Sequence, residues 1–208
     1  MMNKEGILLI VSGPSAVGKG TVVKRAMSLA QERGLPIVLS ISMTSRPAKA
    51  NEKEGSDYFF VSRDEFETAI ANNGLIEYNE YNGNYYGTKR EFVEDCLEKG
   101  QDVILEIDVN GGKQVTDQYK NAVTVFIMPP SLKDLETRIR LRNRDNEDEI
   151  IARLATGRKE IAGCGWYDYI IVNNIIEEAA ESLLSVIEAE KHKASRNINM
   201  IDEVLGDE

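Results

Sequence analysis

Short apolar runs alternate along the chain with longer segments of helical periodicity. The runs are too short for buried helices and are typical of strands covered on both faces of a sheet. The expected strands span residues 6–11, 36–42, 58–61, 75–81, 102–108, 122–128 and 167–172. The expected helices span residues 21–33, 62–73, 88–100, 111–119, 149–161 and 176–193, with another beginning at 131. This alternation predicts a parallel sheet flanked by helices, whose ligands bind at the carboxyl ends of the strands.

The segment 41–87 departs from this alternation. Its strands at 58–61 and 75–81 lie close together, and Asn82-Gly83 is a strong hairpin signal before Asn84. Thr88 and Glu91 have the spacing of a helix capping box, as do Ser62 and Glu65. We therefore expect a small β-rich insert in an otherwise βα chain, and little order in the tail from residue 194 onwards.

A glycine-rich loop joins the first strand to the first helix. Its residues are Gly13, Pro14, Ser15, Ala16, Val17, Gly18, Lys19, Gly20 and Thr21. Glycines let such a loop wrap round phosphate oxygens, a helix N-terminus adds partial positive charge, and Lys19 adds a full one. The usual hydroxyl after the lysine is replaced by Gly20, so Thr21 or an ordered water is expected to serve Mg²⁺ instead.

The charge pattern narrows the classes of function. A formal net charge of −10 argues against a general nucleic-acid binder. Arg138, Arg140, Arg142 and Arg144 nevertheless fall within seven residues, which suggests a local anion site.

Residue usage excludes several kinds of chemistry. The single histidine, His192, lies in a charged C-terminal helical segment, which argues against histidine-based triads and histidine-rich metal sites. Cys96 and Cys164 are expected to be free thiols. No apolar run is long enough to span a membrane, and no signal peptide is recognised, so we expect one cytoplasmic domain with insertions.

From the insert onwards the sequence resembles guanylate kinases. The resemblance begins at 40–47, continues through Gly55 and 58–60, and returns at 76–78, 83–88 and 105–108. The arginine-rich helix and 167–173 extend it, so that it covers about residues 6–190. The motifs occur in the family's order and spacing.

This resemblance implies a three-part enzyme with a P-loop NTPase fold. Residues 1–40 and 88–208 would form the core, 41–87 the GMP-binding insert, and about 137–158 a helical lid within the core. The implied reaction converts ATP and GMP to ADP and GDP with Mg²⁺. Use of dGMP and the choice between monomer and homodimer stay open.

The resemblance also implies a role for individual residues. ATP would be bound by the glycine-rich loop, Arg138 and Asn173. Lys19, Arg142 and Arg153 would stabilise the transferring phosphoryl group. Glu106 would orient water on Mg²⁺. The GMP site would comprise Ser42, Arg46, Lys49, Tyr58, Glu77, Tyr86, Thr88 and Asp108. Glu77 and Asp108 suit guanine because its N1–H and amino group donate hydrogen bonds, whereas adenine has no donor at N1.

Other interpretations of these residues remain open. Asp108 follows a strand and also suits a helix cap, and arginine runs are usually solvated. Lys49 stands where the family usually has a second arginine, and it keeps the charge without the planar fork. Leu141 and Asn143 flank Arg142 where the family often has glycines.

Two alternative functions also stay open. One is a guanylate-kinase-like interaction module without catalysis, although such modules typically have a degraded P-loop and lid. The other is a P-loop kinase for a different nucleoside monophosphate, against which Glu77 and Asp108 argue.

Overall fold

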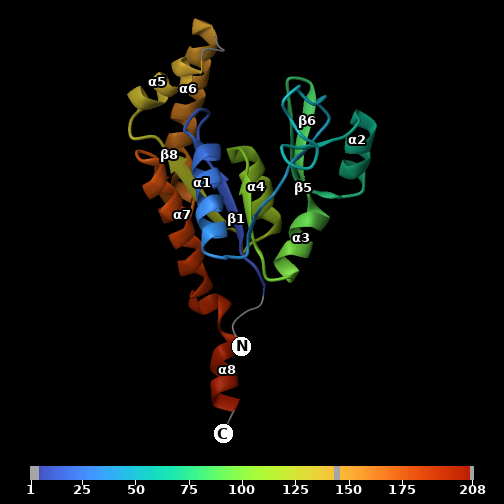
Figure 1. Ribbon diagram of the computed structural model, residues 1–208, viewed down its shortest axis with the longest axis vertical. Coiled ribbons are helices and arrows are strands. Elements are labelled where there is room, and N and C mark those ends of the chain that lie inside the picture. Colours follow the sequence, from blue (N-terminus) through green and yellow to red (C-terminus); the bar gives the residue numbers. More distant parts are fainter. Residues whose placement is uncertain (1–4, 143–145, 207–208) are drawn as a thin grey trace.

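The computed structural model of the chain describes residues 5–142 and 146–206 (Figure 1). Its strands are β1 (Leu8–Ser12), β2 (Ile37–Leu39), β3 (Met43–Thr44), β4 (Phe59–Phe60), β5 (Leu75–Tyr81), β6 (Asn84–Lys89), β7 (Asp102–Glu106), β8 (Val123–Met128) and β9 (Tyr169–Val172). Its helices are α1 (Lys19–Glu32), α2 (Arg63–Ala71), α3 (Arg90–Glu98), α4 (Val109–Gln118), α5 (Leu132–Leu141), α6 (Glu147–Ala162), α7 (Ile176–Lys191) and α8 (Asn199–Gly206), with 3-10 turns η1 (Cys164–Trp166) and η2 (Ala194–Arg196).

In the described part of the chain, five strands form a parallel sheet in the order β2-β7-β1-β8-β9. The central strand β1 is buried along its whole length. Its side chains alternate between two hydrophobic clusters, with Leu9 and Val11 in one and Leu8 and Ile10 in the other. Burial on both faces explains the uninterrupted apolar run in the sequence.

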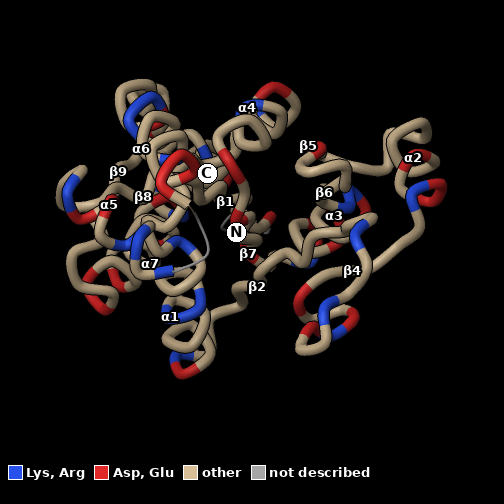
Figure 2. The backbone as a smooth tube through the Cα atoms, turned by 90° about the horizontal axis from the view of Figure 1, so that it is seen from above, with Lys and Arg blue, Asp and Glu red and all other residues tan. Residues whose placement is uncertain are grey.

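Helices cover both faces of this sheet. On the side of Leu9, α1 and α7 pack against each other and against the strands, while α3 and α4 cover the side of Leu8. Viewed from above, α1 and α4 lie on opposite sides of β1 (Figure 2). The predicted α/β fold with a parallel sheet flanked by helices is confirmed.

The remaining strands form a separate sheet in the order β4-β3-β6-β5. Its hairpin joins β5 to β6 through Asn82 and Gly83, whose φ angles of 50° and 73° suit a type I′ turn. The expected hairpin is therefore confirmed. The two-residue strand β3 was expected to be loop, because its sequence carries no alternating pattern of its own.

The capping box expected at Thr88 is wrong. Helix α3 begins one residue later, with Lys89 at its N-cap and no side-chain cap bond. Thr88 instead belongs to β6, where its hydroxyl donates to the Glu77 carboxylate on β5. A cross-strand partner has outweighed the local capping pattern. The other box, at Ser62 and Glu65, forms as expected.

Helices α5 and α6 follow β8 and stand above the carboxyl end of the sheet (Figure 1). Ser131 caps α5 as expected, by accepting a hydrogen bond from the Asp134 amide. Helix α6 begins slightly earlier than expected, because Asn146 and Glu149 form a reciprocal capping box. Asn143 and Arg144, which the sequence analysis singled out, lie outside the described residues.

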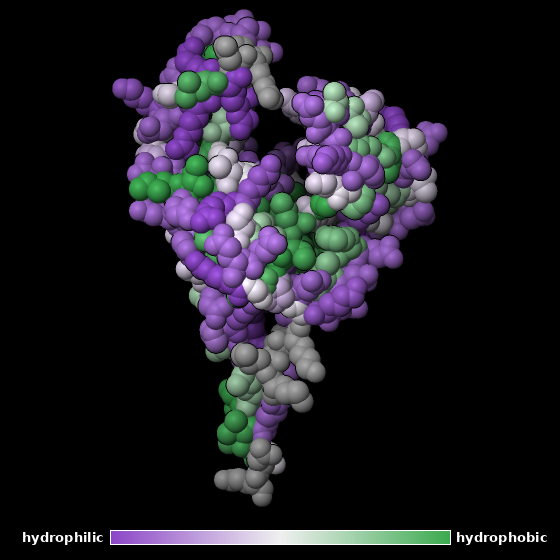
Figure 3. Space-filling model, viewed as in Figure 1, coloured by the Kyte–Doolittle hydropathy of each residue, from purple (hydrophilic) through white to green (hydrophobic). Residues whose placement is uncertain are grey.

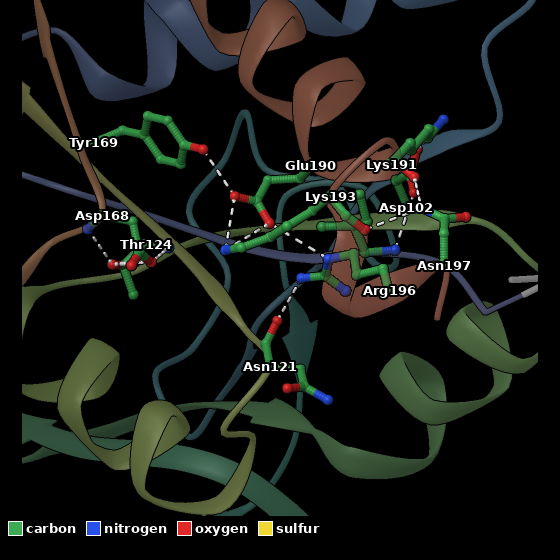
Figure 4. A network of polar contacts seen from close by, with 11 residues as sticks. Asp102, Asn121, Thr124, Asp168, Tyr169, Glu190, Lys191, Lys193, Arg196 and Asn197 are labelled. Atoms are coloured by element: carbon green, nitrogen blue, oxygen red, sulfur yellow. Dashed lines mark hydrogen bonds and ion pairs between the residues drawn. The ribbon is translucent and has the colours of Figure 1, made fainter. Parts of the chain in front are cut away.

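A polar network joins the end of α7 to the opposite, amino edge of the sheet (Figure 4). At its centre is Glu190, only 3% exposed, which accepts a 2.7 Å hydrogen bond from the Tyr169 hydroxyl. Lys193 and Arg196 each approach Glu190 to 3.3 Å. Arg196 also donates to the Asn121 carbonyl at 2.7 Å, which ties η2 to the body of the protein.

The tail is more ordered than the sequence analysis expected. After η2 the chain forms α8, which extends away from the body and has no buried residue (Figures 1 and 3). Ile198, Ile201 and Leu205 are more than half exposed at helical spacing. That spacing was the missed signal of a helix.

Several expectations about residue types are also met. Cys96 and Cys164 are both buried free thiols. His192 is exposed and lies 3.3 Å from Glu188. Across residues 5–142 and 146–206, none of the helices combines the length and the apolar character needed to cross a membrane.

Candidate active site

The glycine-rich loop is shaped by two positions that exclude side chains. Gly13 and Gly18 have φ angles of 149° and 95°. A Cβ atom on Gly13 would lie 2.3 Å from the Ile127 carbonyl oxygen, and one on Gly18 would lie 2.6 Å from Nδ2 of Asn173. Gly18 is the N-cap of α1 and provides no side-chain cap. The first turn of α1 therefore opens towards the loop, in the form that favours an anion.

Lys19 lies inside this loop, where its Nζ donates to the Gly13 carbonyl at 2.7 Å. Burial lowers the pKa of the Lys19 ammonium, and the carboxylates of Glu106 and Glu160 oppose that change. The Arg142 charge adds to the lowering of this pKa, so the C-terminal end of α5 is within electrostatic range of Lys19. A partly desolvated ammonium among these groups gains from an incoming phosphate.

Gly20 faces the carboxylate of Glu106, the last residue of β7. A Cβ atom on Gly20 would lie 3.3 Å from both carboxylate oxygens of Glu106. Desolvation raises the pKa of Glu106, and the Lys19 charge counteracts this. A hydroxyl side chain at position 20 would therefore crowd Glu106, whereas Thr21 is exposed at the start of α1. Among the described residues, no group of three or more His, Cys, Asp or Glu could hold a metal ion.

Arg138 and Asn173 both donate hydrogen bonds to the backbone of the glycine-rich loop. The Arg138 guanidinium donates to the carbonyls of Val17 and Asn173, both at 2.8 Å. Asn173 is 3% exposed, and its Nδ2 also donates to the Val17 carbonyl at 2.8 Å. These bonds tie α5, the loop and the end of β9 together. Direct contact of either side chain with ATP stays a prediction.

Arg142 and Arg153, the other two arginines expected in the site, lie on either side of residues 143–145, which the structure does not describe. Arg142 follows α5 and is exposed, whereas Arg153 lies on α6 and is partly buried. Their expected convergence on a transferring phosphoryl group stays a prediction.

Glu77 is a buried carboxylate on β5 with 6% of its surface exposed. Thr88, directly opposite on β6, donates to Glu77 Oε1 at 2.6 Å. Burial raises the pKa of Glu77 to about 7 against the effect of this bond, and Asp108 raises it further. Glu77 is therefore not a solvent-exposed carboxylate of the strand surface.

Asp108 is the N-cap of α4, as its alternative interpretation proposed. Its Oδ1 accepts from the Gly111 amide at 2.8 Å and its Oδ2 accepts from Asn79 Nδ2 at 3.0 Å. A Cβ atom on Gly111 would lie 2.9 Å from Glu77 Oε2. Both carboxylates thus converge on the first turn of α4, and each carboxylate oxygen has lone pairs left for a ligand.

A second cluster, with Arg46 at its centre, lies in the insert. The Arg46 guanidinium lies 5.4 Å from the centroid of the Tyr58 ring, and the Tyr58 and Tyr86 centroids are 6.0 Å apart. Arg46 also binds Glu52 through both Nη atoms, at 2.8 and 2.9 Å. Glu52 and Tyr86 raise the pKa of Arg46, and the pKa of Glu52 falls to about 2. Sequence reasoning missed Glu52, whose only signal is its charge.

Lys49 and Ser42 are placed differently from Arg46. Lys49 is exposed, and its backbone amide, rather than its ammonium, donates to Glu52 at 2.8 Å. Ser42 is half-buried just before β3, and its carbonyl pairs with the Phe59 amide. The contribution of either side chain to a phosphate or a base stays a prediction.

The loop and the insert face each other across a hollow. The glycine-rich loop follows β1, Glu106 ends β7 and Asp108 lies two residues later, all at the carboxyl edge of the main sheet, and the second sheet stands beside them. Figure 3 shows the surface hollowed between the α5–α6 side and the insert. The elements that carry Lys19, the Arg46 cluster and the two carboxylates thus lie on the two sides of this hollow.

Comparison with known proteins agrees with this geometry. The family model described as guanylate kinase matches residues 5–190. A guanylate kinase of Carboxydothermus hydrogenoformans is 44% identical over 192 residues, 92% of each chain. One of Streptococcus thermophilus is 44% identical over 206 residues, 99% of this chain and 97% of the relative.

A solved structure leads to the same family. The crystal structure of a guanylate kinase from Anaplasma phagocytophilum aligns with a TM-score of 0.78 at 34% identity, covering 98% of this chain and 96% of the other. Fold, site geometry and relatives agree over nearly the full length, and the chain belongs to the guanylate kinase family.

Proposed function

We propose that this chain transfers the γ-phosphoryl group of ATP to the phosphate of GMP, giving ADP and GDP. The observation that carries the proposal is the pair Glu77 and Asp108, converging on the first turn of α4. Two carboxylates can accept both the N1–H and the amino group of guanine. Adenine would leave at least one buried acceptor without a donor, which is costly.

The glycine-rich loop binds ATP in this proposal. Its backbone and the N-terminus of α1 face the phosphates, and the Lys19 ammonium leaves the Gly13 carbonyl for phosphate oxygens. Arg138 and Asn173 stabilise the loop from behind through the Val17 carbonyl. Both side chains also contact the bound ATP. The buried Asn173 Oδ1 has no hydrogen-bond partner among the described residues, so it can accept a hydrogen bond from ATP.

Arg46, Tyr58 and Tyr86 bind the GMP phosphate. Glu52 binds both Nη atoms of the Arg46 guanidinium and fixes its plane, and the remaining N–H groups donate to phosphate oxygens beside the Tyr86 hydroxyl. Lys49 adds charge without a fork. Thr88 acts on the base indirectly by orienting Glu77, and Ser42 supplies a hydroxyl to the base.

Transfer itself requires positioning and neutralisation of charge. The acceptor phosphate has a second pKa of about 6 and is largely dianionic at pH 7, so it needs no strong general base. Lys19, Arg142 and Arg153 stabilise the charge that develops on the transferring group. Closure of the lid, about residues 137–158, would bring the two arginines towards Lys19.

The oxygen donors beside the loop fit Mg²⁺, which ATP carries into the site. Glu106 faces Gly20 in the first turn of α1, and the exposed residue Thr21 lies in the same turn. Hard oxygen ligands of this kind, with nucleotide phosphates and water, are what Mg²⁺ prefers. Glu106 would hold water on the ion and Thr21 would offer its hydroxyl. When bound, the ion neutralises charge on the phosphates.

The proposal divides the chain into three parts. Residues 1–40 and 88–208 are the core, 41–87 the GMP-binding insert and about 137–158 the lid. The existence of a separate sheet between Met43 and Lys89 supports this division.

An assay of ADP release tests the function directly. ATP and Mg²⁺ are supplied with GMP, dGMP, AMP, UMP, CMP or dTMP in turn. Turnover with a guanine nucleotide and little with the others is the expected result. Turnover with AMP alone would assign another acceptor, and none with any acceptor would leave a binding module.

A further inference from the structure

The two carboxylates proposed to recognise guanine come from different sheets. Glu77 lies on β5, the edge strand of the second sheet, whereas Asp108 follows β7 of the main sheet and caps α4. A planar base with two neighbouring donors can satisfy both carboxylates only at one separation. Something must therefore fix β5 against α4.

Gln114 makes that connection through its side-chain amide. Its Oε1 accepts from the Tyr78 amide at 3.1 Å, and its Nε2 donates to the Tyr78 carbonyl at 3.0 Å. Tyr78 adjoins Glu77 on β5, which pairs with β6 on one side and, in the described part of the chain, with no strand on the other. The glutamine amide thus takes the place of a strand residue, and α4 lies alongside β5 (Figure 1).

Gln118 continues the pattern one helical turn later. Its Nε2 donates to the Ile76 carbonyl at 2.8 Å. Four helical residues rise about 6 Å, close to the roughly 6.7 Å that separates alternate residues of a strand, so the two glutamines match β5 in register. Asn79 adds a direct bond to Asp108 at 3.0 Å from the next position on β5.

We propose that Gln114 is a positioning residue for base selectivity, which sets the separation of Glu77 and Asp108 by holding the Tyr78 backbone. This inference rests on the proposed function, because it concerns how the same site tells guanine from other bases. A side-chain amide presents its donor and its acceptor on separate atoms, as a peptide group does, and it adds no charge beside the two carboxylates.

GMP and IMP distinguish this role from a merely structural one. Hypoxanthine keeps the N1–H of guanine but lacks the 2-amino group, so IMP makes one donor contact fewer. GMP gains from the second carboxylate only when the separation is right. Loosening β5 should therefore lower kcat/KM more for GMP than for IMP, whereas general damage to the fold lowers both alike.

The experiment compares Gln114→Met, which keeps the size and removes both bonds, with Gln114→Glu, which keeps the acceptor and loses the donor. Gln31→Met is the matched control on an exposed position of α1. For each protein kcat/KM is measured with GMP and with IMP, together with KM for ATP and Tm. We expect both Gln114 variants to lower the GMP-to-IMP ratio roughly five- to ten-fold, with KM for ATP and the Gln31→Met values unchanged.

Two results would overturn the inference. They are an unchanged ratio in a folded Gln114 variant and an equal fall for GMP and IMP. If Gln114→Met fails to fold, Gln114→Glu decides the matter alone. Failure of the proposed function looks different, because the unmodified enzyme would then show no turnover of GMP.

Discussion

Arg46 and Glu52 form a two-point ion pair across a loop of the insert, with the Lys49 amide bound to the same carboxylate. Their side chains are 16% and 18% exposed. The pair folds the loop back on itself and fixes the plane of the guanidinium. An arginine held in this way loses little conformational freedom when it binds a phosphate.

Glu52→Gln should therefore weaken the use of GMP. The neutral amide keeps an acceptor but cannot hold both Nη atoms as a carboxylate does, so the Arg46 fork is less well aligned. We expect KM for GMP to rise several-fold with KM for ATP unchanged, as measured by steady-state kinetics. A lower KM for GMP would show instead that Glu52 competes with the phosphate. Glu54→Gln in the same loop is the control.

Glu77→Gln should separate acceptor recognition from donor binding. The amide can present only one acceptor atom, and its amino group opposes the donors of guanine. We expect kcat/KM for GMP to fall by about 100-fold or more, since a site built for a donor loses selectivity when its acceptor is removed. ATP affinity, measured by calorimetry, should be unaffected, and equal losses for both nucleotides would exclude the assignment.

The raised pKa of Glu77 also predicts how stability depends on pH. Its folded pKa of about 7 lies above the ordinary value of 4.5, so the folded state binds the proton more tightly than the unfolded chain. The associated stability is fully present below about pH 4.5 and is lost as the pH rises to about 7, in total about 3 kcal/mol. Glu77→Gln should remove this loss.

Urea unfolding of both proteins at pH 5 and pH 8, without nucleotide, checks this. The variant should gain stability relative to the unmodified protein at pH 8 and much less at pH 5. A difference that does not change with pH would show that Glu77 ionises normally in the fold.

Lys19→Met should abolish transfer while leaving the fold intact. The substitution keeps the length of the side chain and removes the charge that meets the phosphates, and loss of one such group typically costs about 100-fold or more in kcat. The rate of GDP formation measures the loss, and circular dichroism with GMP binding checks the fold. A near-normal rate would remove Lys19 from the mechanism.

Arg138→Lys should loosen the glycine-rich loop. A lysine can reach one carbonyl but cannot bridge those of Val17 and Asn173 with a planar fork. We expect a loss of about 1 kcal/mol in stability and a several-fold rise in KM for ATP. Arg140→Lys, on the exposed side of the same helix, is the control. An unchanged KM for ATP would show that the hydrogen bonds from Arg138 to the two carbonyls do not affect ATP binding.

The features that were predictable from sequence are those with a local cause. The buried run before Gly13 and the glycines of the loop give the strand, the turn and the helix start from neighbouring residues alone. The pair Asn82-Gly83 likewise favours a tight turn over any other local structure. The family's motifs then identify Glu77 and Asp108, whose separation along the chain carries no signal of contact.

The features that could not be predicted depend on partners distant in sequence. Thr88 fits a capping box locally, but the buried Glu77 opposite supplies a stronger partner. Gln114 resembles any polar helix residue until β5 is seen beside it. Glu52 lies in a loop without periodicity. In each case the position of the side chain is determined by a hydrogen bond that exists only after the sheets and helices have assembled.

The Glu190 network has a consequence for engineering the chain. Arg196 is the last residue of this network, and the Asn197 side-chain amide donates to the carbonyls of Lys191 and Lys193. Helix α8 has no buried residue, so ending the chain after Asn197, or attaching a fusion partner there, should leave the core covered. Shortening the chain by a few residues more would strip the two cations from a buried carboxylate. The point at which this chain can be shortened is thus set by the ion pairs of Glu190 rather than by the end of a helix.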